Sequence, residues 1–290
     1  MPRALGVLFR AVATLPLPVV HFLGAAAGRA ALRLAAAERR RLAEHLRAAG
    51  YDDVRLARAA AAEAGKLLLE MIWLWQRPTE EVIKLVRSVD GEQIVAEASA
   101  RGKGVIFLTP HLGCFEIAAQ YAGALAPITV LYRSPRQRML RAFARAGRQR
   151  GNVRLVEANT RGATALLGAL RRGEWVGVLP DQVPARGEGE WAEFFGSPAF
   201  TMTLTTRLEQ RTGAAVILCF CERLPRGKGY RIHLERPGPR EAGESAARHL
   251  NRSLEALIRR RPEQYLWSYN RYKSPANVAP AERAERAEGA

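Results

Sequence analysis

A histidine and a glutamate stand close together in the run Thr-Pro-His-Leu-Gly-Cys-Phe-Glu, where they are His111 and Glu116. A carboxylate that hydrogen-bonds to an imidazole fixes its tautomer and makes the ring a better general base. On an ideal helix, residues five positions apart point about 140° away from each other. Glu116 can therefore meet His111 only if the histidine precedes the first regular turn. The pair predicts a base that removes a proton from a substrate.

The surrounding residues predict a strand that leads into a helix. Residues 105–108 are apolar and lie between Gly104 and Pro110, which is typical of a short buried strand. Apolar residues then recur at helical spacing over 112–125. His111 is therefore expected where a strand ends and a helix begins, the position at which open α/β sheets carry ligands.

Several groups near His111 could take part in the chemistry. The region contains no Gly-x-Ser-x-Gly elbow, which argues against a serine hydrolase. Cys114 could be a nucleophile at a helix N-terminus, but a small buried cysteine is the commoner case. A base acting directly on a substrate hydroxyl remains. The backbone N–H groups of 112–114, or an arginine, could hold an oxyanion. The alternative is that His111 is a hydrogen-bonded core residue.

Strands alternate with helices along the middle of the chain, which predicts an α/β fold with a mainly parallel or mixed sheet flanked by helices. Residues 184–197, with an aromatic cluster, are expected to form a loop. The other predicted strands are 128–132, 153–156, 175–180, 214–223 and 230–235, the last two forming a hairpin; the predicted helices are 36–51, 54–75, 136–150, 164–172, 201–213 and 244–261.

Polar residues follow two of these strands. Arg133 comes after 128–132, and Asp181 and Gln182 come after 175–180. If the strands are parallel neighbours, their carboxyl ends share one edge of the sheet, so these residues and His111 face one crevice.

The composition limits the class of partner. The net charge is +17 and the pI about 10.8, which favours an anionic partner such as nucleic acid, anionic lipid, a phosphorylated substrate or an acidic protein. The three cysteines, Cys114, Cys219 and Cys221, form no disulfide framework and no metal motif, as expected in a reducing compartment. No metal site is predicted.

The N-terminal region is apolar and flanked by arginines. No residue from Ala11 to Gly28 carries a formal charge, but Pro16 and Pro18 interrupt the run. A pair of core helices, a signal peptide and a membrane anchor are all possible; arginines on both sides favour a helix in the membrane interface. We expect residues 1–35 to form a membrane-associated helix. Residues 274–290, rich in Ala, Glu, Arg and Pro, are expected to be a disordered tail.

The run Gly104-Val-Ile-Phe-Leu-Thr-Pro-His-Leu-Gly, with Glu116, resembles the late acyltransferases of lipid A biosynthesis, the lauroyl and myristoyl type, which are relatives of the glycerolipid acyltransferases. The resemblance extends to about Lys273. Family members commonly have Asn-Trp where this chain has Cys114-Phe115, and often Asn in place of Gln137. The other matching segments are 132–136, 147–150, 179–182, 187–189, 194–199 and 262–267.

This resemblance implies a single glycerolipid-acyltransferase-like domain over 36–273. It implies transfer of a fatty acyl chain from acyl carrier protein, without a cofactor, to a hydroxyl of a lipid A precursor at the cytoplasmic face of the inner membrane. His111 would take the proton and Glu116 would orient and charge its ring. The helix N-terminus or Arg148 would stabilise the oxyanion. Substrate binding or transition-state support is expected from Arg133, Arg148, Asp181 and Gln182.

Three alternatives remain. A related membrane acyltransferase could act on another glycolipid or an aminolipid; such relatives tend to carry Asp at the position of Glu116. A nucleic-acid binder would need arginines interleaved with exposed aromatics or a known module, and neither is found. A non-catalytic lipid-binding protein would not need the His111–Glu116 pair. The acyl carrier protein, an anionic lipid acceptor and the inner membrane are therefore the expected partners, and nucleic acid is not.

Overall fold

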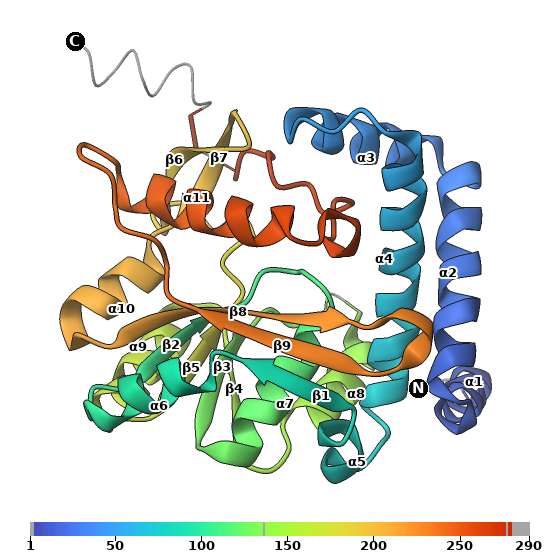
Figure 1. Cartoon of the computed structure of the whole chain (residues 1–290), viewed down its shortest axis with the longest axis horizontal. Coiled ribbons are helices and arrows are strands. Elements are labelled where there is room, and N and C mark those ends of the chain that lie inside the picture. The colour runs from blue at the N-terminus through green and yellow to red at the C-terminus, as the bar shows by residue number, and fades with distance from the viewer. Residues whose placement is uncertain (1–2, 136, 277, 280–290) are drawn as a thin grey trace.

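The computed structural model describes residues 3–135, 137–276 and 278–279 of the chain. A seven-stranded sheet with strand order β1-β9-β8-β2-β5-β3-β4 lies at its centre (Figure 1). Neighbouring strands are parallel except β8 and β9, which form the predicted antiparallel hairpin, so the sheet is mixed. The strands are β1 (Val86–Asp90), β2 (Val105–Leu108), β3 (Ile128–Tyr132), β4 (Val153–Glu157), β5 (Trp175–Val178), β8 (Ala215–Arg223) and β9 (Tyr230–Glu235).

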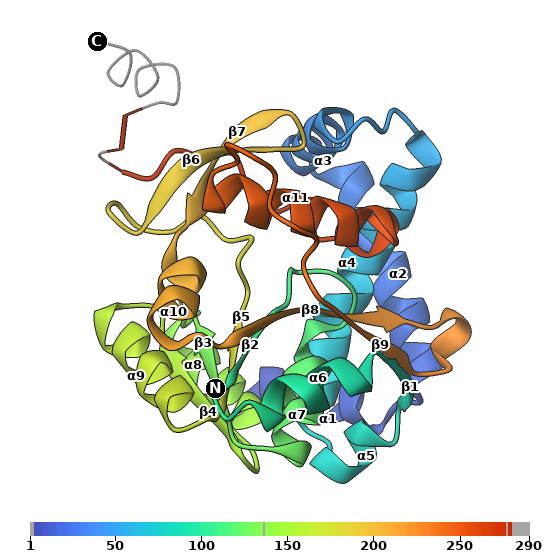
Figure 2. The same cartoon turned by 60° about the vertical axis from the view of Figure 1, so that its left-hand side comes forward.

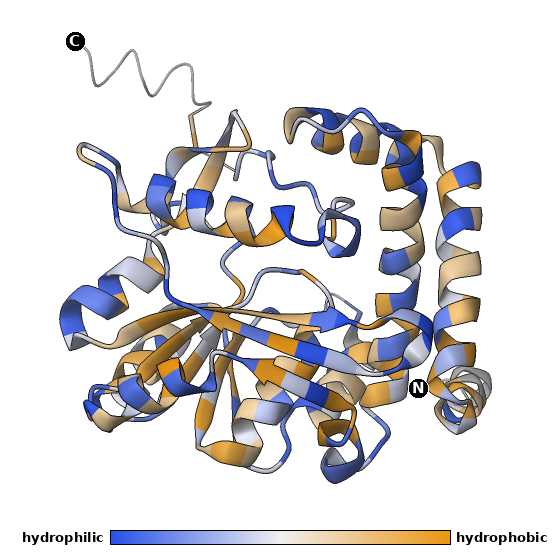
Figure 3. Ribbon diagram, in the orientation of Figure 1, coloured by the Kyte–Doolittle hydropathy of each residue, from blue (hydrophilic) through white to orange (hydrophobic). Residues whose placement is uncertain are grey.

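Helices flank this sheet, which confirms the predicted α/β class. α6 (Glu92–Ala100) and α7 (Phe115–Leu125) lie on one side of it, and α11 (Ala246–Arg259) lies on the other (Figures 1 and 2). In β2, Ile106 and Leu108 belong to one buried core while Val105 and Phe107 belong to the other. Because successive strand side chains point to opposite faces, a strand covered on both sides is apolar throughout. Figure 3 shows hydrophobic residues along the strands and mixed colouring on the outer helices.

Some element predictions need correction. The predicted loop 184–197 contains β6 (Gly189–Phe194), which pairs with β7 (Ser197–Met202) in an antiparallel hairpin. Phe195 and Gly196, both with positive φ, make its two-residue turn. The helix predicted from 201 begins later because β7 includes its first residues. β1, at one edge of the sheet, was missed. The remaining helices of the α/β part are α8 (Arg138–Arg148), α9 (Thr160–Arg171) and α10 (Leu204–Thr212).

The N-terminal helices pack as a layer beside the sheet (Figure 1). The backbones of α2 and α4 are in contact: a Cβ at Gly28 would lie 1.9 Å from the carbonyl oxygen of Ala61, and one at Gly65 would lie 2.1 Å from that of Gly24. Glycine is therefore required at this crossing. The helices of this layer are α1 (Arg3–Thr14), α2 (Leu17–Leu34), α3 (Ala36–Ala48) and α4 (Val54–Leu74), and the short helix α5 (Thr79–Ile83) that follows packs against α7.

No single helix within the described ranges is long and apolar enough to cross a membrane. Only α2 and α3 together meet that criterion, and they are bent by 100°. The membrane association of residues 1–35 and the domain boundaries at 35 and 273 stay predictions. Of the predicted disordered tail, residues 277 and 280–290 lie outside the described residues.

Candidate active site

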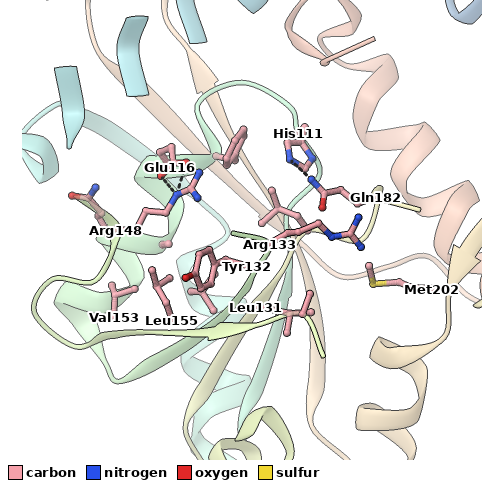
Figure 4. Close-up of a pocket in the computed structure, with 16 residues that line it drawn as sticks. His111, Glu116, Leu131, Tyr132, Arg133, Arg148, Val153, Leu155, Gln182 and Met202 are labelled. Carbon is pink, nitrogen blue, oxygen red and sulfur yellow. Dashed lines mark hydrogen bonds and ion pairs between the residues drawn. The ribbon is translucent and has the colours of Figure 1, made fainter. Parts of the chain in front are cut away.

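Three adjacent strand ends form one pocket. β2, β5 and β3 are parallel neighbours, so His111, Gln182 and Arg133, which follow them, line the same pocket (Figure 4). Glu116 and Arg148 join them from α7 and α8. The convergence expected from the strand pattern is therefore present for His111, Arg133 and Gln182, whereas Asp181 is buried and does not line the pocket.

Asp181 holds the ring of His111 from below the pocket surface. Its Oδ1 accepts a hydrogen bond from Nδ1 of His111 at 2.9 Å, and its Oδ2 accepts one from the backbone N–H of His111, also at 2.9 Å. Asp181 is 1% exposed. Burial by itself would raise the pKa of Asp181, but the charge of His111 and these hydrogen bonds outweigh burial and hold the pKa below its ordinary value. A charged carboxylate at Nδ1 favours the tautomer with the proton there.

The other ring nitrogen, Nε2, faces the pocket. The side-chain amide of Gln182 lies 3.3 Å from it, as a donor to an unprotonated nitrogen would (Figure 4). The ring of Phe115 packs edge-on against the imidazole at 4.8 Å, and the ring of Tyr269 lies parallel to it at 6.4 Å. These contacts fix the imidazole in place. Its Nε2 can accept a hydrogen bond from a substrate hydroxyl that displaces the side-chain amide of Gln182.

Glu116 pairs with Arg148 in the structure, whereas the sequence predicted that it would meet His111. Its carboxylate accepts hydrogen bonds from Nε of Arg148 at 2.9 and 3.0 Å and a further one from Nη2, and its Oε2 also accepts from the indole N–H of Trp75 at 3.0 Å. Asp181 occupies the His111 nitrogen that Glu116 was expected to hold. Glu116 lies in the first turn of α7, from which its side chain meets α8 and the end of α4. These contacts hold the side chain of Arg148, and the part that Glu116 plays in the reaction stays a prediction.

The backbone after His111 is also bonded differently from expectation. The N–H of Leu112 donates to Pro110 at 2.7 Å, that of Gly113 to Gln264 at 3.0 Å, and that of Cys114 to the carbonyl of Cys221 at 2.8 Å. None of the three is free for an oxyanion, which leaves Arg148 as the candidate donor. Gly113 is required because its φ is +61° and a Cβ there would lie 2.0 Å from the Cys221 carbonyl oxygen.

Two other possibilities from the sequence can be assessed. Cys114 is fully buried, and burial raises the pKa of its thiol well above the ordinary value, so it is not a thiolate nucleophile. Within the described part of the chain, no group of three His, Cys, Asp or Glu residues could hold a metal ion.

Comparison with known proteins decides the family. The sequence model of the family described as bacterial lipid A biosynthesis acyltransferase matches residues 4–274 of this chain. The chain belongs to this family. The resemblance seen in the sequence motifs is confirmed.

Curated relatives of this acyltransferase include three from Escherichia coli (strain K12). The lipid A biosynthesis palmitoleoyltransferase is 30% identical over 215 residues, which cover 72% of this chain and 69% of the relative. The lauroyltransferase is 25% identical over 288 residues, covering 96% and 92%. The myristoyltransferase is 28% identical over 213 residues, covering 67% and 62%.

Two further residues, Trp75 and Arg271, interact with the residues of the candidate site. Trp75 hydrogen-bonds Glu116 and lies under the guanidinium of Arg148, 5.0 Å from it. Arg271 is buried; it donates to the carbonyl of Phe200 at 2.8 Å, and its charge lowers the pKa of Asp181. Trp75 lies at the apolar end of the predicted helix 54–75, where the sequence allowed a lining residue of an acyl or cofactor slot but favoured a core residue. No local pattern distinguishes Arg271.

This geometry predicts that Glu116 and Arg148 act as a unit. Arg148→Met is expected to lower kcat by about 10²–10³, the usual cost of losing one oxyanion donor. Glu116→Gln should cause a similar loss, and the double variant little more, because each residue is useful only through the other. Steady-state kinetics of the three variants measure this coupling.

Arg145→Met, an exposed arginine on the same helix, is the matched control and should leave kcat unchanged. Strictly additive losses in the double variant would show that the two residues act independently.

Proposed function

We propose that this acyltransferase transfers a fatty acyl chain from acyl carrier protein to a hydroxyl of a lipid A precursor, as a secondary acylation step in lipopolysaccharide biosynthesis. The observation that carries the proposal is His111, whose Nδ1 is held by Asp181 while Nε2 faces a pocket that also contains the paired Arg148. A histidine held by a buried carboxylate is suited to remove a proton from an alcohol. No cofactor is required.

In the proposed reaction one proton moves from the acceptor hydroxyl to His111 and from there to the leaving thiolate. Nε2 of His111 takes the hydroxyl proton as the acceptor oxygen forms a bond to the thioester carbonyl carbon. The carbonyl oxygen then carries a negative charge, which the guanidinium of Arg148 would stabilise. Collapse of this intermediate breaks the carbon–sulfur bond, and the imidazolium returns the proton to the departing thiolate. Asp181 stabilises the imidazolium throughout and keeps Nδ1 protonated.

The charge of the chain supports an anionic acceptor and an acidic donor protein. The net charge is +17, and Arg133, at the end of β3, is exposed at the pocket. An arginine there can bind a phosphate of the acceptor in bidentate fashion. Basic residues elsewhere on the surface would attract the acidic carrier protein.

Exposed apolar side chains on α2 support a membrane location. Phe22 is 72% exposed and Leu34 is 87% exposed, and Arg29 and Arg33 are exposed on the same helix. A helix with large apolar groups and arginines at its surface binds an anionic bilayer interface. We therefore place the N-terminal region at the inner membrane, with the catalytic pocket on the cytoplasmic side.

Mass spectrometry of lipid A tests the function. Cells that lack the protein should produce lipid A with one acyl chain fewer, and expression of the parental protein should restore it. Expression of His111→Ala should not restore it, since the base is missing, although the variant protein should still be found in the membrane fraction. An unchanged lipid A profile, with a new or missing acylated species among other glycolipids or aminolipids, would assign a different acceptor.

A further inference from the structure

A second pocket lies next to the catalytic pocket and shares part of its lining. It has a volume of about 390 Å³ and lies between the sheet and the helices α6 and α7, which are on the same side of the sheet (Figure 1). Its lining is mostly apolar. The two pockets share Phe115, Ala119, Val130 and Leu179. Because Phe115 also packs against His111, the junction lies beside the catalytic base.

One strand determines the shape of this second pocket. Alternate residues of β5 and its extension, Trp175, Gly177 and Leu179, line it, as expected for side chains on one face of a strand. Leu179 lies at the junction with the catalytic pocket. Gly177 has no side chain, which leaves a trough in the middle. Trp175 fills the space at the start of the strand, so the trough ends there.

The position of Trp175 is fixed by its neighbours. Its indole N–H donates to the hydroxyl of Ser99 on α6 at 3.1 Å, and its ring packs edge-on against Phe107 at 5.3 Å. A stop that is held by a hydrogen bond and by an aromatic contact cannot move aside cheaply. The facing helix α7 presents small side chains toward the trough, Ala118, Ala119 and Ala122.

The dimensions of the second pocket limit the length of the hydrocarbon chain that it can hold. The ten steps from Phe115 to Leu125 on α7 rise by roughly 15 Å, and the four steps from Trp175 to Leu179 on β5 and its extension span roughly 13 Å. An extended hydrocarbon chain advances roughly 1.25 Å per carbon, given bonds of about 1.5 Å at tetrahedral angles. The pocket therefore accommodates roughly ten to twelve methylene groups beyond its junction with the catalytic pocket.

We propose that this second pocket holds the acyl chain of the donor and that Trp175 limits that chain to about the length of a dodecanoyl group. The inference rests on the proposed function, because it takes the thioester carbonyl to lie beside His111. An unbranched, saturated chain suits a straight, apolar trough between a strand and a helix. A longer chain would have to displace Trp175 from Ser99 or leave methylene groups in water, and each exposed methylene weakens binding roughly fourfold.

The test is the length profile of transfer. Saturated acyl carrier protein thioesters from octanoyl to hexadecanoyl are supplied one at a time with a lipid A precursor, and the rate is measured for the parental enzyme and for Gly177→Val. A Cβ at Gly177 would lie 3.3 Å from Val130, close enough that only small shifts are needed. The parental rate should be greatest near dodecanoyl. In Gly177→Val the maximum should move to decanoyl or shorter, while octanoyl transfer is retained.

Gly168→Val, on the surface of α9, is the matched control and should keep the parental profile. An unchanged profile in Gly177→Val, or a parental profile without a maximum, would overturn the proposal. A second experiment distinguishes the acyl-chain pocket from the proposed function. It measures the binding of free fatty acids of the same lengths by the shift in Tm that they cause. If no donor is transferred, the proposed function fails. The proposed pocket would still be supported if the shift in Tm depended on chain length and Gly177→Val moved its maximum to shorter fatty acids. Equal shifts in both proteins would overturn the proposal.

Discussion

Asp181→Asn is expected to lower kcat by about 10⁴, the loss seen when the carboxylate of a histidine–carboxylate pair becomes an amide. The side chain keeps its size, but its amide group can donate to Nδ1 of His111 and so favour the tautomer with a proton on Nε2. That tautomer cannot accept a proton from the substrate hydroxyl. Steady-state kinetics with acyl donor and lipid acceptor provide the measurement.

KM should change little in this variant, because Asp181 is buried beneath His111 and does not line the pocket. Asp90→Asn is the matched control, since Asp90, on the edge strand β1, also contacts a histidine nitrogen, that of His233 at 3.2 Å. It should retain parental kcat. If Asp181→Asn remained within tenfold of the parental kcat, Asp181 would not be the partner that makes His111 a base.

Glu70→Gln is expected to lower the free energy of unfolding by about 3–5 kcal/mol, the usual cost of removing one partner of a buried ion pair. Glu70 is fully buried and binds Arg223 through two nitrogens, at 3.0 and 2.6 Å, as well as His21 at 2.8 Å. It also accepts a hydrogen bond from the hydroxyl of Tyr230. The variant leaves the buried charge of Arg223 with only Glu63 as partner. Denaturant unfolding measures the change.

This difference in stability should depend on pH. Burial alone would raise the pKa of Glu70, but Arg223 and the hydrogen bond of His21 outweigh it and lower the pKa far below the ordinary value. A depressed pKa contributes stability above the pKa of the unfolded chain, and this contribution is lost as the pH falls toward the folded value. The free energy of unfolding of the parental protein should therefore exceed that of Glu70→Gln most at neutral pH. This difference should become smaller at pH values below the ordinary pKa of glutamic acid.

Glu97→Gln, which removes an exposed partner of Arg236 at 2.8 Å, is the control and should cost less than about 1 kcal/mol. Unfolding of Glu70→Gln at the parental midpoint would show that the buried cluster adds nothing to stability.

The same cluster connects the N-terminal helices to the catalytic loop. Arg223 ends β8, and its backbone N–H and carbonyl are both hydrogen-bonded by the side-chain amide of Gln264, at 2.8 and 3.0 Å. The backbone carbonyl of Gln264 in turn accepts the N–H of Gly113. His21 on α2 is thus linked to the residues that follow His111. The loop that carries His111 is held by contacts from β8 and from the short helix Pro262–Gln264, and α4 supports them through Glu70 and Arg223.

The departure from the family pattern at Cys114-Phe115 lies within this arrangement. Cys114 is buried at the start of α7, where its N–H bonds Cys221. Phe115 contacts His111 and lines both pockets. Cys114 therefore has a structural role, and Phe115 lies where the proposed acyl chain would pass His111.

The sequence alone determined the features that depend on local pattern. The strand before His111, the helix after it, and the strands that end at Arg133 and Asp181 follow from short apolar runs and their flanking residues. Parallel neighbours then place these strand ends together, because a parallel sheet has all its carboxyl ends at one edge. The many matching segments, taken together, indicated the family.

Only the tertiary structure decided which carboxylate pairs with which basic side chain. Glu116 is five residues from His111 and Asp181 is seventy residues away, yet Asp181 holds the ring because β5 lies beside β2 in the sheet. Glu116 instead meets Arg148 and Trp75, which arrive from α8 and the end of α4. Distance along the chain does not rank side-chain partners, because packing brings together groups from separate elements and each buried charge pairs with whichever opposite charge packing places within reach.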